Sequence, residues 1–333
     1  MRILVTGGAG FIGSHLVDAL MSRGFEVVVL DNLSSGCLEN VAKWLKDSNF
    51  RFVRGDLLSL DEVLNVLDGC GIVFHLAANP EVRVGSISPN IHFRENILAT
   101  FNLLEAVRKA GNVERLVFTS SSTVYGEAEI PTPENYALLR PISVYGASKL
   151  ACEALISAYA HSYGFNAYIY RLANIVGPRS RHGVIIDFVK KLSENPKELE
   201  ILGDGAQSKS YLYVDDCVEA LLLSLERSLG HFEIFNVGSE DQVDVLTIAR
   251  IVAEEMGLTN VKFRLTGGVN GGRGWIGDVK NMLLDISKLK KVGWKPRYNS
   301  LEAVKLTVKS ILAKRGKSQN LLTLRRQSSV RRV

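Results

Sequence analysis

The chain has 333 residues, of which 46% are hydrophobic and 23% are charged. This composition excludes a disordered chain, a collagen, a small disulfide-stabilised scaffold and a membrane-embedded bundle. The formal charge of +5 comes from residues 314–333, which carry seven basic side chains and no acid; the preceding residues sum to −2 and give no general reason to expect a polyanionic partner.

Short apolar runs alternate with amphipathic stretches over residues 1–171, which predicts parallel strands joined by helical crossovers. The predicted strands are 3–6, 26–30, 51–54, 72–76, 115–119 and 167–171, and the predicted helices are 60–67, 91–110 and 144–163. Ser59 and Glu62 form a capping box before one helix, and Ser88 and Pro89 mark the start of the next. The fold class is therefore α/β, with a doubly wound parallel sheet in a Rossmann domain.

The pattern loosens after residue 171, where glycines and prolines interrupt shorter elements. Residues 172–313 are expected to form a smaller α/β substrate lobe, with some segments returning to the first domain. Helices are predicted there at 214–226, 246–256 and 301–312. Residues 314–333 are basic and have no usable apolar face, which predicts a disordered tail.

Several classes of site find no support in the sequence. The four cysteines and six histidines show no ligand spacing, so no metal site is predicted and the thiols are expected to be reduced. Neither a signal peptide nor an apolar run of membrane-spanning length is present, and no motif that reads nucleic acid occurs. A cytoplasmic protein that binds neither membrane nor nucleic acid is expected.

A glycine-rich segment, Gly7-Gly8-Ala9-Gly10-Phe11-Ile12-Gly13, links the first predicted strand to a helix. It fits Gly-x-x-Gly-x-x-Gly from Gly7 and Gly-x-Gly-x-x-Gly from Gly8. Glycines permit a tight turn and let a pyrophosphate approach the backbone, where the helix N-terminus stabilises its charge. The segment predicts a dinucleotide site.

Two carboxylates follow the next two predicted strands. Asp31 comes 18 residues after Gly13, where it can accept both adenosine ribose hydroxyls and repel a 2′-phosphate, which favours NAD over NADP. Asp56 is placed to hold the adenine edge. For both residues, a role in a turn or as a helix cap is the alternative interpretation.

Tyr145 and Lys149 are four residues apart and therefore share one face of a helix. A nearby ammonium group, together with an oxidised nicotinamide, favours the phenolate and lets a tyrosine act as a base. Ser121 belongs to the run Ser120–Gly126, which follows the fifth predicted strand. Such sheets place their ligands at this edge.

Together, these motifs resemble the extended short-chain dehydrogenase/reductase superfamily, and within it the UDP-glucose (UDP-galactose) 4-epimerases. The resemblance extends from residue 1 to about residue 312 and rests on the glycine loop, residues 31–36, His75-Leu76-Ala77-Ala78, Asn96, residues 120–126 and the Tyr145/Lys149 pair.

The resemblance implies that Tyr145 is the base, that Lys149 orients the nicotinamide ribose and tunes Tyr145, and that Ser121 bonds the sugar hydroxyl. The implied cofactor-binding residues, besides these three, are Gly7, Gly10, Phe11, Ile12, Gly13, Asp31, Asn32, Leu33, Ser34, Ser35, Gly36, Asp56, Leu57, Leu76, Ala77, Ala78 and Asn96. The implied substrate-binding residues are Ser121, Tyr145, Asn174, Gly183, Val184, Phe188, Lys209 and Arg273.

Two positions depart from the family pattern. Lys209 stands where the family usually has an arginine that binds the diphosphate, so it keeps the charge but loses the bidentate fork. Trp275 stands where a second arginine aligns, and Arg273 is expected to reach the diphosphate instead. Met282, aligned beside the C2 substituent of the sugar, does not decide between sugars.

The implied activity is that of an isomerase with tightly bound NAD that interconverts UDP-glucose and UDP-galactose through a transient 4-keto sugar and enzyme-bound NADH, and that forms a homodimer. UDP-glucuronate or UDP-N-acetylhexosamine 4-epimerisation are the alternatives. A non-catalytic NAD-sensing regulator is the alternative from another class. Related 4,6-dehydratases carry Asp-Glu where this chain has Ser122-Thr123, which disfavours dehydration.

Overall fold

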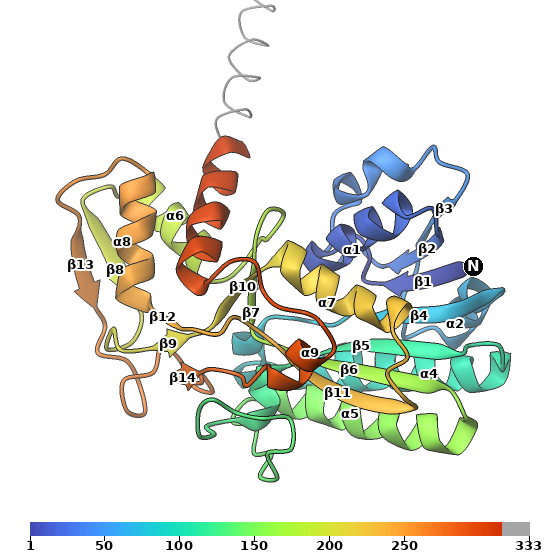
Figure 1. The fold of residues 1–333 in the computed structure, drawn as a ribbon. Coiled ribbons are helices and arrows are strands. Elements are labelled where there is room, and N and C mark those ends of the chain that lie inside the picture. The colour runs from blue at the N-terminus through green and yellow to red at the C-terminus, as the bar shows by residue number, and fades with distance from the viewer. Residues whose placement is uncertain (315–333) are drawn as a thin grey trace, which may run out of the picture.

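Seven parallel strands form the central sheet of the computed structural model, which describes residues 1–314 (Figure 1). Their order is β3-β2-β1-β4-β5-β6-β11, with every neighbouring pair parallel. The strands are β1 (Arg2–Thr6), β2 (Glu26–Asp31), β3 (Phe50–Arg54), β4 (Cys70–His75), β5 (Arg115–Ser121), β6 (Asn166–Leu172) and β11 (Phe232–Val237). The order reverses between β1 and β4, which confirms the doubly wound fold and places a ligand crevice at their carboxyl ends.

The sequence pattern explains why these segments form central strands. Residues 27–30 of β2 are all apolar and at most 3% exposed, as expected of a strand covered on both faces. β5 runs two residues further than predicted, so that Ser121 pairs with Leu172 of β6. The sheet therefore holds the serine run in place up to the edge of the crevice.

Two layers of helices cover the sheet (Figure 1). α1 (Phe11–Ser22) and α7 (Val214–Glu226) pack together on one face. α2 (Leu60–Leu67), α4 (Ala99–Ala110) and α5 (Val144–Tyr163) pack side by side on the other. Each layer shares a hydrophobic cluster with the sheet, so burial of apolar side chains on both faces stabilises the arrangement.

The helix predicted over 91–110 is interrupted. It consists of α3 (Asn90–His92), a π-helical segment (Phe93–Leu98) and α4, which continue one another. The wider turn carries Asn96, which is 2% exposed and donates from Nδ2 to the Ser148 hydroxyl at 2.9 Å. A tertiary contact therefore accompanies the break in the regular helix.

The capping box predicted before α2 does not form, and Ser88 is not the N-cap of α3. Ser59 is the N-cap of α2, but its side chain makes no capping bond; Glu62 instead accepts from the backbone N–H of Asp56 at 2.8 Å. The helix start expected at Ser88 has Pro89 as its N-cap, again without a side-chain bond. At α2, the glutamate satisfies a donor of the preceding loop rather than the helix end.

A third hydrophobic cluster lies in the C-terminal half, where α6 (Val184–Glu194), α8 (Val245–Glu255) and the helix of residues 300–314 pack beside the parallel pair β8 (Glu198–Ile201) and β13 (Lys262–Leu265) (Figure 1). The predicted helix 214–226 is confirmed, and the other two begin one residue earlier than expected. The other strands and α-helix are β7 (Asn174–Val176), β9 (Ser208–Lys209), β10 (Tyr211–Tyr213), β12 (Val243–Asp244), β14 (Asn281–Met282) and α9 (Ser287–Lys291). Short 3₁₀ helices lie at Leu38–Asn40, Ala42–Trp44, Val82–Ser86 and Ser122–Tyr125.

β11 comes from this half of the chain but completes the central sheet beside β6. The division into a first domain ending at residue 171 and a second lobe stays a prediction. The tail predicted over 314–333 lies outside the described residues, except for residue 314, which is helical. Within the described part of the chain, no helix has the length and apolar character needed to cross a membrane.

Candidate functional site

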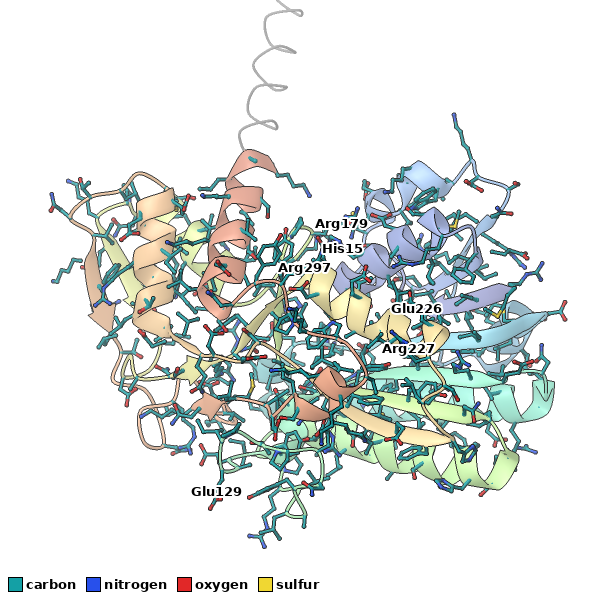
Figure 2. All side chains as sticks on the ribbon, viewed as in Figure 1. His15, Glu129, Arg179, Glu226, Arg227 and Arg297 are labelled. Atoms are coloured by element: carbon teal, nitrogen blue, oxygen red, sulfur yellow. The ribbon has the colours of Figure 1, made fainter. Side chains whose placement is uncertain are left out.

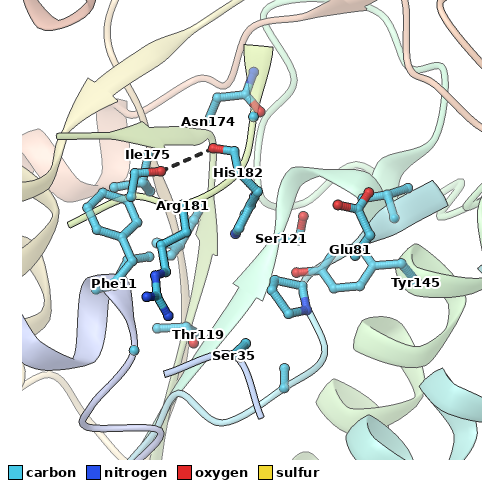
Figure 3. A pocket seen from close by; sticks show the side chains of 18 of the residues that line it. Phe11, Ser35, Glu81, Thr119, Ser121, Tyr145, Asn174, Ile175, Arg181 and His182 are labelled. Atoms are coloured by element: carbon cyan, nitrogen blue, oxygen red, sulfur yellow. Dashed lines mark hydrogen bonds between the residues drawn. The ribbon is translucent and has the colours of Figure 1, made fainter. Parts of the chain in front are cut away.

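A cavity of about 690 Å³ opens at the carboxyl ends of the sheet and reaches into the C-terminal half (Figure 3). Most of the predicted site residues line it: Gly7, Gly10, Phe11, Ile12, Gly13, Asp31, Asn32, Ser34, Ser35, Asp56, Leu57, Leu76, Ala77, Ala78, Ser121, Tyr145, Lys149, Asn174, Gly183, Val184, Phe188 and Lys209. Residues that lie up to about two hundred positions apart in the sequence therefore line the same cavity.

Four predicted residues, Leu33, Gly36, Asn96 and Arg273, do not line the cavity. Leu33 and Gly36 lie close to the Asp31 carboxylate: the Leu33 N–H donates to it, and a Cβ at Gly36 would lie 3.0 Å from both carboxylate oxygens. Asn96 is buried behind the wall. The guanidinium of Arg273 forms an ion pair with Glu127 and lies outside the cavity lining, so its contact with the substrate stays a prediction.

The glycine loop has the shape that a pyrophosphate requires. Gly7 has φ +69°, a left-handed conformation that favours glycine, and a Cβ at Gly13 would lie 2.1 Å from the Gly7 carbonyl oxygen. α1 begins after Gly10 without any side-chain cap, so the N–H groups of its first turn are free for an anion. Of the two glycine spacings that fit the sequence, the one that begins at Gly7 agrees with the structure. Gly7 lines the cavity, whereas Gly8 packs against Val29.

The Asp31 carboxylate is fixed in the wall at the end of β2. It accepts from the Ala9 N–H at 2.9 Å and from the Leu33 N–H at 2.8 Å. Burial raises the pKa of Asp31, and these two bonds oppose the rise. Asn32 donates to Asp56 at 3.1 Å, which joins the ends of β2 and β3 into one polar rim.

Lys149 lies one turn after Tyr145 on α5, a helix whose first turn is capped by the Ser143 side chain through the Gly146 N–H at 3.0 Å. Lys149 is 3% exposed, and its ammonium donates to the Thr119 carbonyl of β5 at 2.9 Å. Burial lowers the pKa of Lys149 to about 8. The helix and the neighbouring strand together hold this cation at the base of the cavity.

The hydroxyls of Ser121 and Tyr145 approach each other across the cavity wall (Figure 3). Burial raises the pKa of Tyr145 to about 12, and its hydrogen bond with Ser121 opposes that rise. The Ser121 hydroxyl accepts from both the N–H and the hydroxyl of Thr123, at 3.2 and 2.9 Å. Two hydroxyls and a cation thus converge where strand β5 meets helix α5.

The far end of the cavity lies among the short strands. Lys209 forms an ion pair with Asp278 at 2.5 Å and lies 5.3 Å from the centroid of the Trp275 ring. Met282, which pairs with Lys209 between β14 and β9, also lines the cavity. Asp278 therefore offsets part of the charge that Lys209 offers to an anion.

Sequence reasoning missed four cations in the lining, namely Arg83, Arg179, Arg181 and Lys190. None of them belongs to a motif with fixed spacing. The only available signal was the basic run Arg179-Ser180-Arg181-His182 after Gly177-Pro178.

The chain resembles proteins of known family in both sequence and structure. The model of the NAD dependent epimerase/dehydratase family matches residues 3–238. The chain belongs to this family. The fit of its glycine loop and Asp31 to a dinucleotide agrees with the family's cofactor, NAD. Family membership also confirms the resemblance to the extended short-chain dehydrogenase/reductases.

Curated relatives of this epimerase-family protein span nearly its whole length. A putative UDP-glucose 4-epimerase of Methanocaldococcus jannaschii is 36% identical over 92% of this chain and 97% of its own. A UDP-glucuronate 4-epimerase of Thermodesulfobacterium geofontis is 32% identical over 92% of this chain and 94% of its own. The two relatives carry names with different sugars.

Solved structures of UDP-sugar 4-epimerases also match nearly the whole chain. A UDP-galactose 4-epimerase is 48% identical, with a TM-score of 0.82 over 94% of this chain and 99% of its own. The Thermus thermophilus UDP-glucose 4-epimerase, solved as a complex with NAD, is 36% identical, with a TM-score of 0.81 over 93% and 98%. The UDP-N-acetylglucosamine 4-epimerase of Methanobrevibacter ruminantium is 31% identical, with a TM-score of 0.82 over 94% and 98%.

Proposed function

We propose that this NAD-dependent epimerase interconverts UDP-glucose and UDP-galactose by inverting the 4-hydroxyl of the sugar. The observation that carries the proposal is the convergence of Ser121, Tyr145 and Lys149 in the same cavity as the glycine loop. One nucleotide can lie on the loop while a second extends towards Lys209. A cavity of this kind supports chemistry between a cofactor and a sugar nucleotide.

In this proposal Tyr145 takes the proton of the sugar 4-hydroxyl and later returns a proton to the same oxygen. Ser121 bonds that oxygen, and Lys149 orients the nicotinamide ribose. When bound, NAD supplies a reversible hydride acceptor, so that the reaction involves no net oxidation. The remaining lining residues hold the two nucleotides and limit the access of water.

Proton removal by Tyr145 needs a positive charge nearby, because burial raises its pKa to about 12 despite the hydrogen bond with Ser121. The Lys149 ammonium lies 6.0 Å from the centroid of the Tyr145 ring, which favours the phenolate. The charge of an oxidised nicotinamide acts in the same direction. Tyr145 is therefore expected to act as a base only when NAD is bound in the cavity.

The choice of glucose and galactose rests on similarity. The UDP-galactose 4-epimerase structure shares 48% identity, against 32% for the UDP-glucuronate and 31% for the UDP-N-acetylglucosamine 4-epimerase. UDP-glucuronate and UDP-N-acetylhexosamines are the second candidates, because proteins named for them cover the chain equally well.

We also propose that the enzyme retains NAD through turnover and forms a homodimer in the cytoplasm. The layer of α4 and α5 leaves Phe101 39% and Tyr163 52% exposed, and Phe93 just before α4 is 55% exposed. Exposed aromatic side chains on two neighbouring helices fit a self-association surface. Sedimentation of the purified protein at twice the monomer mass supports the dimer, and a monomer contradicts it.

The substrate is tested by incubating the purified protein separately with UDP-galactose, UDP-N-acetylgalactosamine and UDP-galacturonate, and by measuring each 4-epimer. We expect conversion of UDP-galactose to have the highest kcat/KM. Conversion of only one of the other two would replace the proposed sugar. No turnover of any of them would contradict 4-epimerisation.

A further inference from the structure

The loop of residues 177–183 lies against α1 at the cofactor end of the cavity. His15 Nε2 donates to the Pro178 carbonyl at 3.0 Å, and Arg179 Nη2 donates to Asp18 Oδ2 at 2.7 Å. Figure 2 shows His15 and Arg179 together at this junction, and Arg179 lines the cavity. Residues 177–183 therefore place the Arg179 guanidinium next to α1, the helix that follows the glycine loop.

Asp18 fixes one end of this guanidinium. Its carboxylate also accepts from the Trp44 indole N–H at 2.7 Å and lies 3.1 Å from the Lys43 ammonium. Burial raises the pKa of Asp18, but the bonds from Trp44 and Arg179 outweigh it, so the net pKa is lowered. An ionised carboxylate with several donors is a rigid anchor.

The other end of the guanidinium lacks an acceptor. Arg179 Nη1 is buried and has no hydrogen-bond partner within residues 1–314. A buried donor left in this state costs roughly 1–3 kcal/mol, and more when it is charged. The residue also has φ +69°, a left-handed conformation that costs a side-chain-bearing residue roughly 1–2 kcal/mol. Two unfavourable features at one position in a ligand cavity point to a role in binding.

We propose that Arg179 binds the pyrophosphate of NAD, with Nη2 on Asp18 and Nη1 on a phosphate oxygen. A guanidinium suits this task because its fixed fork can serve two acceptors at once. The glycine loop offers an anion backbone N–H groups and the helix dipole, and Arg179, which is anchored on α1 by Asp18, adds a full positive charge. The inference rests on the cofactor of the family and not on the identity of the sugar.

The diphosphate of the sugar nucleotide is the other phosphate that this cavity would hold. The contact of the 177–183 loop with α1, rather than with Lys209 and its strands, favours the cofactor. The experiment therefore measures both ligands. Its two readouts are the rate at which NAD bound to the holoenzyme exchanges for isotopically labelled NAD, and the Kd of UDP.

Three variants isolate the contribution of Arg179. Arg179→Gln removes the charge and is expected to speed NAD exchange about 10- to 100-fold, as expected for loss of one charge-assisted hydrogen bond. Arg179→Lys keeps the charge but replaces the two separate Nη donors of the planar fork with a single ammonium point charge, so it should give an intermediate rate. Arg23→Gln is the matched control, because Arg23 ends α1 outside the cavity lining and pairs with Glu219 at 3.4 Å. The control should exchange NAD like the wild type.

The Kd of UDP should stay within about twofold in all three variants. Unchanged NAD exchange in Arg179→Gln would overturn the proposal, and a weaker UDP complex with unchanged NAD exchange would assign Arg179 to the sugar nucleotide. Weakening of both ligands would indicate general loosening and also contradict it. If Arg179→Gln does not fold, Arg179→Lys, which can keep the Asp18 pair, carries the test. Neither readout depends on turnover, so failure of the epimerase proposal would be recognised separately.

Discussion

His75 is a fully buried imidazole at the end of β4, next to the cofactor side of the cavity. Its Nδ1 lies 2.8 Å from the Thr6 hydroxyl and its Nε2 lies 2.9 Å from the Thr100 hydroxyl. Burial lowers the pKa of His75 to about 3, and the charge of Lys149 acts in the same direction. The folded protein therefore holds this ring neutral in weak acid.

This pKa predicts an acid-sensitive stability. Between pH 6.5 and about 3 the unfolded state binds a proton on His75 that the folded state does not, so the free energy of unfolding falls as the pH is lowered. Each pH unit in this window contributes up to ~1.4 kcal/mol. Urea unfolding at several pH values should show a shallower slope for His75→Gln than for the wild type. Equal slopes would contradict the assignment.

At this scale the sequence predicts residues whose chemistry depends on local spacing. Gly7, Asp31 and the Tyr145/Lys149 pair line the cavity as expected because each sits at the end of a strand or on one helix turn. Arg179 could not be predicted, because its place in the wall depends on how a loop from the second half docks on α1. The pairing of Arg273 was not predictable for the same reason, because its partner, Glu127, is distant in sequence.

Helix α5, which carries Tyr145 and Lys149, also holds one side of a buried ion pair. Glu153, two turns after Tyr145, accepts from Arg171 of β6 at 2.7 Å and also from the hydroxyl of Ser120. Arg171 further donates to the Tyr125 hydroxyl at 2.9 Å. The ion pair ties the helix that carries Tyr145 to β6, and the bond from Ser120 ties the same helix to β5, the strand that ends in the serine run.

Breaking this pair from one side should be costly. Glu153→Gln leaves the Arg171 guanidinium buried without its counter-charge, which is expected to lower the free energy of unfolding by ~3–5 kcal/mol. The double variant Glu153→Gln/Arg171→Gln should lose clearly less than the sum of the two single variants. Urea unfolding of the four proteins measures the coupling. Additive losses would show that the two side chains do not act as a pair.

The elements themselves were predicted well where they are long and periodic. Six of the seven strands of the central sheet, and helices such as α7, follow from apolar runs and helical spacing, whereas β11 was not predicted. The π-helical turn before α4 was not predictable, because Asn96 is turned inward by a bond to Ser148, which lies 52 positions away. The two- to four-residue strands near Lys209 carry too few residues for any periodic pattern.

The two halves of the chain meet across the cavity, and their contacts decide which cations reach it. Lys209 lines the cavity although it pairs with Asp278, whereas Arg273 lies outside the lining and pairs with Glu127. Lys209→Gln should therefore raise the KM for UDP-galactose by about tenfold or more, as expected for loss of a charge-assisted contact. Arg273→Gln should leave it within about threefold.

Steady-state kinetics of these two variants provides the comparison. A larger effect at Arg273 than at Lys209 would restore the original assignment of Arg273 to the diphosphate and contradict the position seen here. Similar effects at both positions would mean that the two cations share the anion. The wild-type KM, measured in the same buffer, is the reference because phosphate contacts weaken with salt.

The central claim is that Tyr145 moves the proton of the sugar 4-hydroxyl in a site that holds NAD independently of it. The most direct test follows conversion of UDP-galactose to UDP-glucose by the wild type and by Tyr145→Phe, with the NAD content of both proteins measured. We expect the variant to retain NAD and to lose about 10²- to 10⁴-fold in kcat. A variant that keeps NAD and the wild-type kcat would contradict the claim.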